Sequence, residues 1–185
     1  MEWFRSLLQK MLADTLDDLK SDSDYIQMKL PIEKITKEFE EALKIRAEHG
    51  IIHAKIREAR LNDIETFQKL HELIWQNTHM RYKPFSKDLL RDLIRDPNIT
   101  FLIAKVDGVD SGFGILYFTG NEKEVGVVAA LGVIPGLQGK GLGTILGLKV
   151  WEFIKNKGLK ELHCRVSKEN KNGYRFIRSL GFVEY

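Results

Sequence analysis

Three glycines at alternate positions, Gly139, Gly141 and Gly143, stand between an apolar run and a helical pattern. Because glycine has no Cβ, the oxygens of an anion can approach the main chain, and the chain can take the positive φ that a nest of N–H groups requires. A helix that begins here would also direct its unpaired N–H groups and the positive end of its dipole at the same point. The stretch therefore predicts a binding site for the phosphate groups of a small ligand.

The flanking residues predict the elements that hold this loop. Residues 125–134 are apolar, β-branched or small, and end at Pro135-Gly136, which indicates a strand buried on both faces. After the loop, apolar residues recur at helical spacing, and Gly158 offers a left-handed cap for the end of that helix. The apolar positions of the helix are Ile145, Leu148, Val150, Trp151 and Ile154.

Other phosphate loops fit this stretch less well. A Walker loop would need glycine at position 134 and Ser or Thr after the lysine, but the residues are Ile134 and Gly141. The dinucleotide fingerprint would need its third glycine at position 144, which is Thr144.

The loop resembles motif A of the GNAT superfamily, the acyl-CoA-dependent N-acetyltransferases. The signature of that motif is Gln/Arg-x-x-Gly-x-Gly/Ala, and Gln138, Gly141 and Gly143 fill it here. Residues 131–135 are similar to the end of the family's fourth strand, and residues 166–182 resemble its motif B. The residues that carry this second match are Val166, Asn170, Gly173, Arg175, Phe176, Leu180, Gly181 and Phe182.

Composition limits the classes of protein that fit. With 185 residues and 43% hydrophobic content, the chain can bury one core and a small appendage. A single cysteine, Cys164, excludes an internal disulfide and a cysteine-rich metal site, and no metal is expected. No apolar stretch has the length of a transmembrane helix. The first apolar run is not a secretory signal, because Gln9, Lys10 and Asp14 interrupt it. A soluble, cytoplasmic protein is expected.

Charge is unevenly distributed. Residues 132–185 carry ten Lys or Arg against four Asp or Glu, a net charge of +6, whereas residues 1–50 carry eight against eleven, a net charge of −3. A basic C-terminal third around the loop suits a small polyanion, while nucleic acid would call for a dense basic cluster with interleaved aromatics. Asp14, Asp17 and Asp18 argue against binding of the first helix to anionic lipid. Neither nucleic acid nor a membrane is an expected partner.

Residues 1–50 are predicted to form a helical extension and residues 51–185 a GNAT-like acetyltransferase domain. The extension would consist of two amphipathic helices separated by a loop at 21–24, the second opened by Pro31 and closed by Gly50. Their apolar stripes must be covered, either by the following domain or by a second copy of the chain. The stripes consist of Trp3, Phe4, Leu7, Leu8, Met11, Leu12, Leu16 and Leu19, and of Ile32, Ile35, Phe39, Ala42 and Leu43.

The predicted order of elements in residues 51–185 is the order of the GNAT fold. It starts with a strand at 51–60, a helix capped by Asn62-Asp63, a helix at 84–95 and strands at 100–106 and 113–119. After the strand, loop and helix described above come a strand at 161–167 and a helix at 170–180. The resemblance implies an α/β fold with a mixed twisted sheet flanked by helices.

The end of the sequence has room only for the beginning of the family's last strands, so incomplete C-terminal strands are expected. The strand at 161–167 would then have an open edge. Either the chain is truncated, or another segment or a second chain covers that edge. The favoured interpretation is a truncated or strand-poor domain that leans on its N-terminal helices, with a homodimer as one arrangement.

The resemblance implies an acyltransferase that moves an acetyl group from acetyl-CoA to a primary amine by direct attack in a ternary complex. The pantetheine arm would lie between the fourth and fifth strands, around Val133 and Cys164, and the N–H of Val133 would bond the acyl oxygen. The pyrophosphate would lie on the amides of residues 139–144. The expected CoA-binding residues are Leu131, Gly132, Val133, Gln138, Gly139, Lys140, Gly141, Leu142, Gly143, Thr144 and Asn170.

Two catalytic residues are predicted. Glu124 would act as the base through a water molecule, although its position is also typical of an ordinary charged residue in a hairpin. His163 is an alternative base. The family's usual acid, a tyrosine seven residues after the motif B asparagine, falls on Ile177, so Tyr174 is the proposed substitute. Cys164, alone in an apolar strand, is expected to be a core residue and not a nucleophile.

The acceptor would contact the first two helices of the domain and their connection. Large side chains without concentrated charge gather there and suit an apolar or peptide-like amine, either a small molecule or a peptide. They are Trp75, His79, Met80, Tyr82 and Phe85. Two alternatives stay open: a non-catalytic CoA-binding or interaction module with the GNAT fold, and a nucleotide-binding regulator with the same loop.

Overall fold

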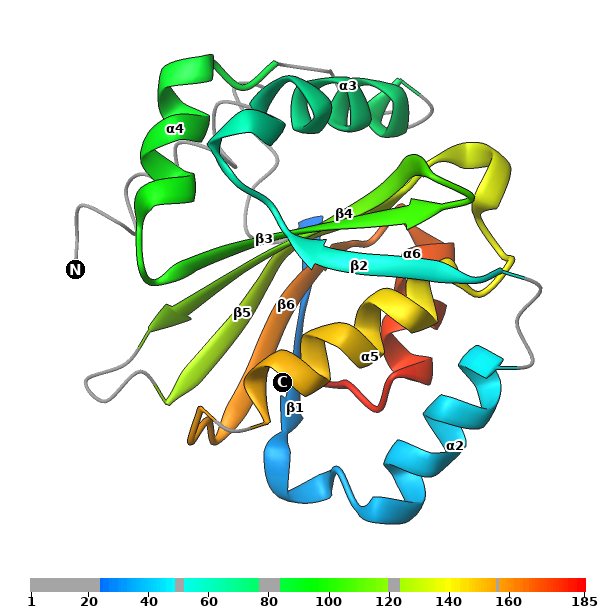
Figure 1. The fold of residues 1–185 in the computed structure, drawn as a ribbon. Helices are drawn as coiled ribbons and strands as arrows, with labels where there is room; N and C mark the ends of the chain where they lie inside the picture. Colours follow the sequence, from blue (N-terminus) through cyan, green and yellow to red (C-terminus); the bar gives the residue numbers. More distant parts are fainter. Residues whose placement is uncertain (1–23, 49–51, 77–83, 120–123, 156) are drawn as a thin grey trace.

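The computed structural model describes residues 24–48, 52–76, 84–119, 124–155 and 157–185. In these residues one mixed sheet has the strand order β2-β3-β4-β5-β6-β1-β7, with helices on both faces (Figure 1). Helices α3 and α4 cover one face, and α2, α5 and α6 lie on the other. This architecture confirms the expected fold class. No described helix is at once long and apolar enough to cross a bilayer.

The elements have the following bounds. The strands are β1 (Tyr25–Pro31), β2 (Ala54–Glu58), β3 (Ile99–Val106), β4 (Val109–Thr119), β5 (Val125–Val133), β6 (Glu161–Ser167) and β7 (Val183–Glu184). The α-helices are α2 (Lys37–Glu48), α3 (Ile64–Trp75), α4 (Lys87–Arg95), α5 (Leu142–Ile154) and α6 (Lys171–Ser179). Short 3-10 turns are η2 (Ile32–Lys34), η3 (Leu61–Asp63) and η4 (Pro135–Leu137).

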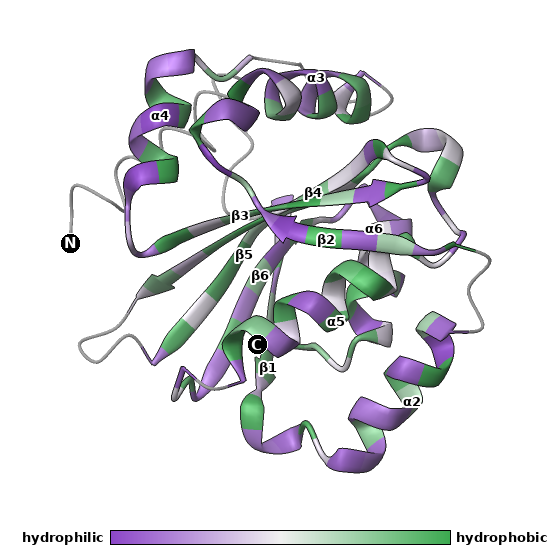
Figure 2. Cartoon of the chain, viewed as in Figure 1, coloured by the Kyte–Doolittle hydropathy of each residue, from purple (hydrophilic) through white to green (hydrophobic). Residues whose placement is uncertain are grey.

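The hydrophobic core lies on both sides of the sheet because the middle strands are covered on both faces. Strand β3 is buried at all but one of its positions, and β3 and β5 are drawn mainly in the apolar colour in Figure 2. Phe67 and Leu90 pack from α3 and α4 on one face, and Val150 and Ile177 pack from α5 and α6 on the other. The sheet is thereby packed on both faces up to the end of β5, and the glycine loop follows.

Strand β1 was not expected. Residues 25–31 pair antiparallel with all of β6, from Tyr25 opposite Ser167 to Pro31 opposite Glu161, and the other edge of β1 pairs with β7. Apolar residues alternate with polar ones in this stretch, and Met28 and Leu30 are buried, so the period is that of a strand. The segment before residue 50 thus supplies the neighbour that β6 needs.

The prediction of a helix opened by Pro31 was therefore wrong in its start. The helix is α2, which begins at Lys37, after the strand and a 3-10 turn. The first expected helix and the boundary at residue 50 lie outside the described residues, so the two-part division stays a prediction, as does a homodimer.

Strands β5 and β6 are parallel but separate early. Their paired register runs from Val125 opposite Glu161 to Val128 opposite Cys164. At the same point the register between β5 and β4 shifts, because Ala129 is an extra residue between Val128 and Ala130. A bulge of this kind bends its strand. Strand β5 therefore leaves β6 after Val128, five residues earlier than the position predicted for the separation.

Candidate functional site

The glycine loop has the backbone that its sequence predicts. Gly139 and Gly141 have φ values of 72° and 98°, in the left-handed region that favours glycine. Gly141 is the N-cap of α5. The N–H groups of Leu142, Gly143 and Thr144, the first helical residues, have no acceptor within the helix. The loop thus combines turned backbone with a helix N-terminus, the arrangement that binds anions.

Gly143 has a different role from the other two glycines. It lies inside α5, and a Cβ built on it would stand 3.1 Å from the Cζ atom of Phe176 in α6. Its lack of a side chain therefore allows the two helices to pack closely, and positive φ is not involved. Positive φ, which was expected at all three glycines, therefore occurs at Gly139 and Gly141 and not at Gly143.

The side chains of the loop divide between core and solvent. Leu142 is fully buried and Thr144 is nearly so, while Gly139 and Lys140 are exposed. Any contact of Leu142 or Gly139 with an anion would therefore come from the main chain. Lys140 adds one exposed positive charge to the loop.

Gln138 ties the loop to the end of β5. Its side-chain amide donates a hydrogen bond of 3.0 Å to the carbonyl oxygen of Val133. The residue after Val133, Ile134, donates its N–H to the carbonyl oxygen of Ser111, near the start of β4. Because main-chain groups alternate in direction along an antiparallel pair, the N–H and C=O of Val133 and of Leu131 point away from β4. They face the side from which β6 has separated.

Gly132 lies between these two residues and has a packing role. A Cβ on Gly132 would stand 3.0 Å from Phe113 and 3.1 Å from Ile74 of α3. Its main-chain groups belong to the pairing with β4, opposite Phe113. The structure therefore brings Leu131, Val133 and the glycine loop together. Gly132 lets β5 pack closely against Phe113 and α3.

Asn170 caps helix α6. Its Oδ1 atom accepts a hydrogen bond of 2.8 Å from the N–H of Gly173. A Cβ on Gly173 would stand 2.5 Å from the side-chain nitrogen of Asn170, so the glycine makes room for the cap. The Asn-x-x-Gly pattern thus starts the helix that packs against α5 through Phe176.

The structure does not bring Glu124 to the loop. Glu124 immediately precedes β5, and its carbonyl oxygen accepts the N–H of Lys160 at 2.7 Å. Nine residues separate it from Val133, roughly 30 Å along an extended strand. It lies five residues, roughly 16 Å, from the bulge at Ala129 where the strands separate.

Tyr174 is directed elsewhere as well. Its hydroxyl group donates a hydrogen bond to the carboxylate of Glu184 in β7, and this bond is the main reason that the pKa of Tyr174 is raised. Strands β6 and β1 lie between β7 and the gap. The bond to Glu184 therefore holds the Tyr174 hydroxyl away from the gap. Ile177, at the position of the family's usual acid, is buried in the core.

Cys164 is a core residue in the structure. Its side chain is buried on the α5 face of β6, and burial raises the pKa of its thiol to about 12. A thiol that stays protonated is a poor nucleophile. The geometry agrees with the interpretation of Cys164 as packing and not chemistry.

A polar cluster on the other face of β6 was only partly foreseen. His163 Nε2 lies 2.7 Å from Glu161 Oε2, and His163 Nδ1 lies 3.1 Å from the hydroxyl of Tyr185. Lys29 of β1 contacts the second oxygen of Glu161 at 3.2 Å. These hydrogen bonds, from His163 first and Lys29 second, lower the pKa of Glu161. The alternation of polar and apolar residues in 161–165 was the available signal.

Aromatic side chains fill the space under α3. His71 is 2% exposed, and its ring lies 4.5 Å from that of Phe85 and 4.6 Å from that of Trp75. Burial lowers the pKa of His71 to about 4. Of the expected acceptor cluster, Trp75 and Phe85 therefore each pack against His71, while His79, Met80 and Tyr82 lie outside the described residues.

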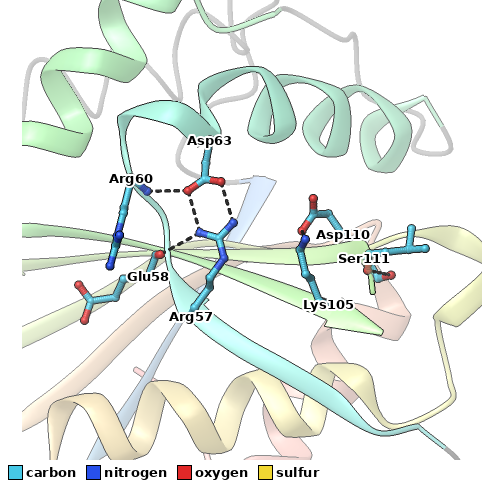
Figure 3. A network of polar contacts seen from close by, with 8 residues as sticks. Arg57, Glu58, Arg60, Asp63, Lys105, Asp110 and Ser111 are labelled. Carbon is cyan, nitrogen blue, oxygen red and sulfur yellow. Dashed lines mark hydrogen bonds and ion pairs between the residues drawn. The ribbon is translucent and has the colours of Figure 1, made fainter. Parts of the chain in front are cut away.

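A surface hollow in the described residues lies at the opposite edge of the sheet and has a structural explanation. Arg57 of β2 makes two hydrogen bonds of 2.7 Å to Asp63, whose carboxylate also accepts the N–H of Arg60 (Figure 3). The hydrogen bond from Arg57 is the main cause of the lowered pKa of Asp63. This network joins β2 to the start of α3. Three strands separate β2 from β6, so the hollow is remote from the gap.

Comparisons with known proteins agree with this geometry. The family model described as the acetyltransferase (GNAT) family matches residues 65–182. Mycothiol acetyltransferase from Actinosynnema mirum is 37% identical over 85 residues, which are 46% of this chain and 28% of that protein. Uncharacterized N-acetyltransferase MJ1207 from Methanocaldococcus jannaschii is 27% identical over 136 residues, 70% of this chain and 60% of that protein. The chain thus spans less than two thirds of both relatives.

Solved structures share the fold. PaiA N-acetyltransferase from Thermoplasma acidophilum, in complex with coenzyme A, has a TM-score of 0.62 and 23% identity, covering 68% of this chain and 87% of that one. An aminoglycoside acetyltransferase, meta-AAC0020, from an uncultured soil metagenomic sample, in complex with sisomicin, has a TM-score of 0.62 and 21% identity, covering 69% and 86%.

Fold and loop together define a mixed α/β acetyltransferase fold. The chain belongs to the acetyltransferase (GNAT) family, as the match over residues 65–182 shows.

Proposed function

We propose that the chain transfers an acetyl group from acetyl-CoA to a primary amine by direct attack in a ternary complex. The observation that carries the proposal is the position of the glycine loop. Gly139 and Gly141 turn the chain into the N-terminus of α5, and they follow the stretch of β5 that has separated from β6. A pyrophosphate site and an opening for an extended arm thus adjoin one another.

The residues present suit the acyl donor. The N–H groups of residues 139–144 would hold the pyrophosphate, with Lys140 adding charge. The main-chain groups of Leu131 and Val133, which point away from β4, would bond the pantetheine amides as a neighbouring strand would. The coenzyme A in the similar PaiA structure supports a site of this kind. Asn170 and Gln138 would act by holding α6 and the loop in place.

The chemistry follows from a held thioester. The amine nitrogen attacks the acyl carbon, the C–N bond forms, and the C–S bond breaks with its electron pair passing to sulfur. The main-chain groups of Val133 and Leu131 bond the arm in this arrangement. The oxyanion that develops would therefore be stabilised by an N–H of β5 nearer the closed end of the gap, and not by that of Val133. Positioning supplies the rest of the rate enhancement, and no covalent enzyme intermediate is needed.

The acceptor is proposed to be a small-molecule or peptide amine. The names of the similar proteins, which include mycothiol and aminoglycoside acetyltransferases, support an acceptor with a primary amine. The packed aromatic residues Trp75 and Phe85 support an acceptor with an apolar portion.

A second candidate is a CoA-binding module without catalysis. The observation that favours it is that Ile177 is buried and that Tyr174 is bonded to Glu184, away from the gap. The decisive test combines calorimetry with CoA and release of free thiol from acetyl-CoA in the presence of a panel of primary amines. Binding with amine-dependent thiol release supports the transferase. Binding without release from any amine would favour the module, and absence of binding would contradict both.

A further inference from the structure

His163 lies at the closed end of the gap between β5 and β6. It is paired with Val127, one position before the pairing of the two strands stops at Val128 and Cys164. Its neighbours Leu162 and Cys164 are buried on the face that α5 and α6 cover. Because side chains alternate along a strand, the imidazole projects from the opposite face, the face of α3 and α4.

Strand β5 itself offers no titratable group on that face. Ala129 and Ala130 pack with the core under α3, and Gly132 faces Ile74. These small residues leave space beside the gap, but none can accept a proton. Val127, the direct partner of His163, is apolar too.

The other described candidates for a base are badly placed. His71 is 2% exposed and enclosed by aromatic rings, so an incoming amine cannot reach it. Glu124 lies roughly 16 Å before the bulge. His163 adjoins the gap and its side chain is 23% exposed.

The imidazole is held in one orientation. The carboxylate of Glu161, at 2.7 Å, fixes the proton on Nε2, and this leaves the lone pair on Nδ1. The Tyr185 hydroxyl donates to that lone pair at 3.1 Å, and Tyr185 is 59% exposed. Among the described residues, charged groups close to this cluster include Lys29 of β1, which contacts Glu161, and Arg165, two residues along β6.

We propose that His163 is the general base that takes the proton of the attacking amine, with Glu161 as its positioning residue. This inference rests on the proposed transferase function. As the C–N bond forms, one proton passes from nitrogen to Nδ1, either directly or through the Tyr185 hydroxyl, which gives up its own proton to Nδ1 and takes that of the amine. The sulfur leaves with the electron pair of the C–S bond and takes a proton from water. The imidazolium then returns its proton to solvent.

The test replaces the base and keeps its hydrogen bonds. In His163→Gln the side-chain amide can still donate to Glu161 and accept from Tyr185, but it cannot take a proton. We expect kcat/KM for a reactive amine to fall about 100-fold, and the acidic limb of its pH profile to disappear. The dissociation constant of CoA should not change. Added imidazole should restore part of the activity of His163→Ala.

Two further variants distinguish the base from its positioning residue and from an unrelated histidine. His53→Gln, a matched change beside β2 at the far edge of the sheet, should leave kcat/KM unchanged. Glu161→Gln should lower kcat about tenfold with little change in KM, and should move the acidic limb to lower pH, because the imidazolium loses its carboxylate partner.

The results separate this inference from the function on which it rests. If the parent releases thiol and His163→Gln does so equally well, His163 is not the base although the transferase function stands. If the parent binds CoA but releases no thiol with any amine, the transferase function fails, and the role of His163 fails with it.

Discussion

The side-chain amide of Gln138 donates a hydrogen bond to the carbonyl oxygen of Val133, at 3.0 Å. This contact joins the first residue of the loop motif to the last residue of β5. It fixes the distance between the two places where the acyl donor is proposed to bind, the helix N-terminus and the strand gap. The glutamine of the motif therefore holds the loop against the end of β5.

Gln138→Ala should weaken CoA binding about fivefold, because a neutral hydrogen bond contributes about 1 kcal/mol. Gln138→Glu should weaken it more, since a carboxylate cannot donate to Val133 and repels the pyrophosphate. Calorimetry measures both. Equal affinities of both variants and the parent would show that the contact does not position the loop.

Gly139→Ala should weaken CoA binding about tenfold, because alanine resists positive φ at a cost of about 1–2 kcal/mol. The matched control is Gly158→Ala beyond the far end of α5. Gly158 also has positive φ, 69°, and neither glycine has an atom within 4 Å of an added Cβ. Both variants should lose similar stability in urea, while only Gly139→Ala loses CoA affinity. A parallel loss of affinity in both would assign the effect to general destabilisation.

Asn170→Ala should lower the free energy of unfolding by about 1 kcal/mol, through loss of the cap on Gly173. Asn170→Ser should retain most of that stability. Ser86, which caps α4 through Leu89, provides the control Ser86→Ala with a similar cost and no effect on CoA. If Asn170→Ser is stable yet binds CoA several-fold more weakly, Asn170 contacts the ligand directly, as the sequence pattern predicted.

Tyr174→Phe should leave kcat within about twofold of the parent, since the hydroxyl is bonded to Glu184 and not directed at the gap. Ile177→Tyr should destabilise the fold by about 1–3 kcal/mol, because it overfills a buried site. Steady-state turnover and urea unfolding are the measurements. A large loss of kcat in Tyr174→Phe would restore Tyr174 as the acid.

His71 should make the protein less stable in mild acid. Burial lowers its pKa to about 4 in the folded state, from 6.5 for the free group. Between those values the unfolded chain binds a proton that the folded chain does not. Stability is therefore full above pH 6.5 and falls as the pH drops towards 4, by at most about 1.4 kcal/mol per pH unit. His71→Phe should flatten this slope in urea titrations, whereas His53→Gln should not.

Local patterns in the sequence determined the loop and most elements of the domain. Alternate glycines before an apolar helical period predict the turn at Gly139 and Gly141 because both signals depend only on neighbouring residues. The order of strands and helices in residues 51–185 follows from the same local periods. The two matched motifs then sufficed for the family.

Tertiary structure alone decided which residues surround the gap. The pairing of β1 with β6 joins residues more than a hundred positions apart, and no local period announces such a partner. The bulge at Ala129 and the direction of Tyr174 depend on neighbouring strands, so the sequence could not show where Glu124 and Tyr174 lie relative to the gap. The contact of His163 with Tyr185 arises because β6, β1 and β7 lie side by side. Spacing along the chain indicates what a residue can do, but packing decides what it can reach.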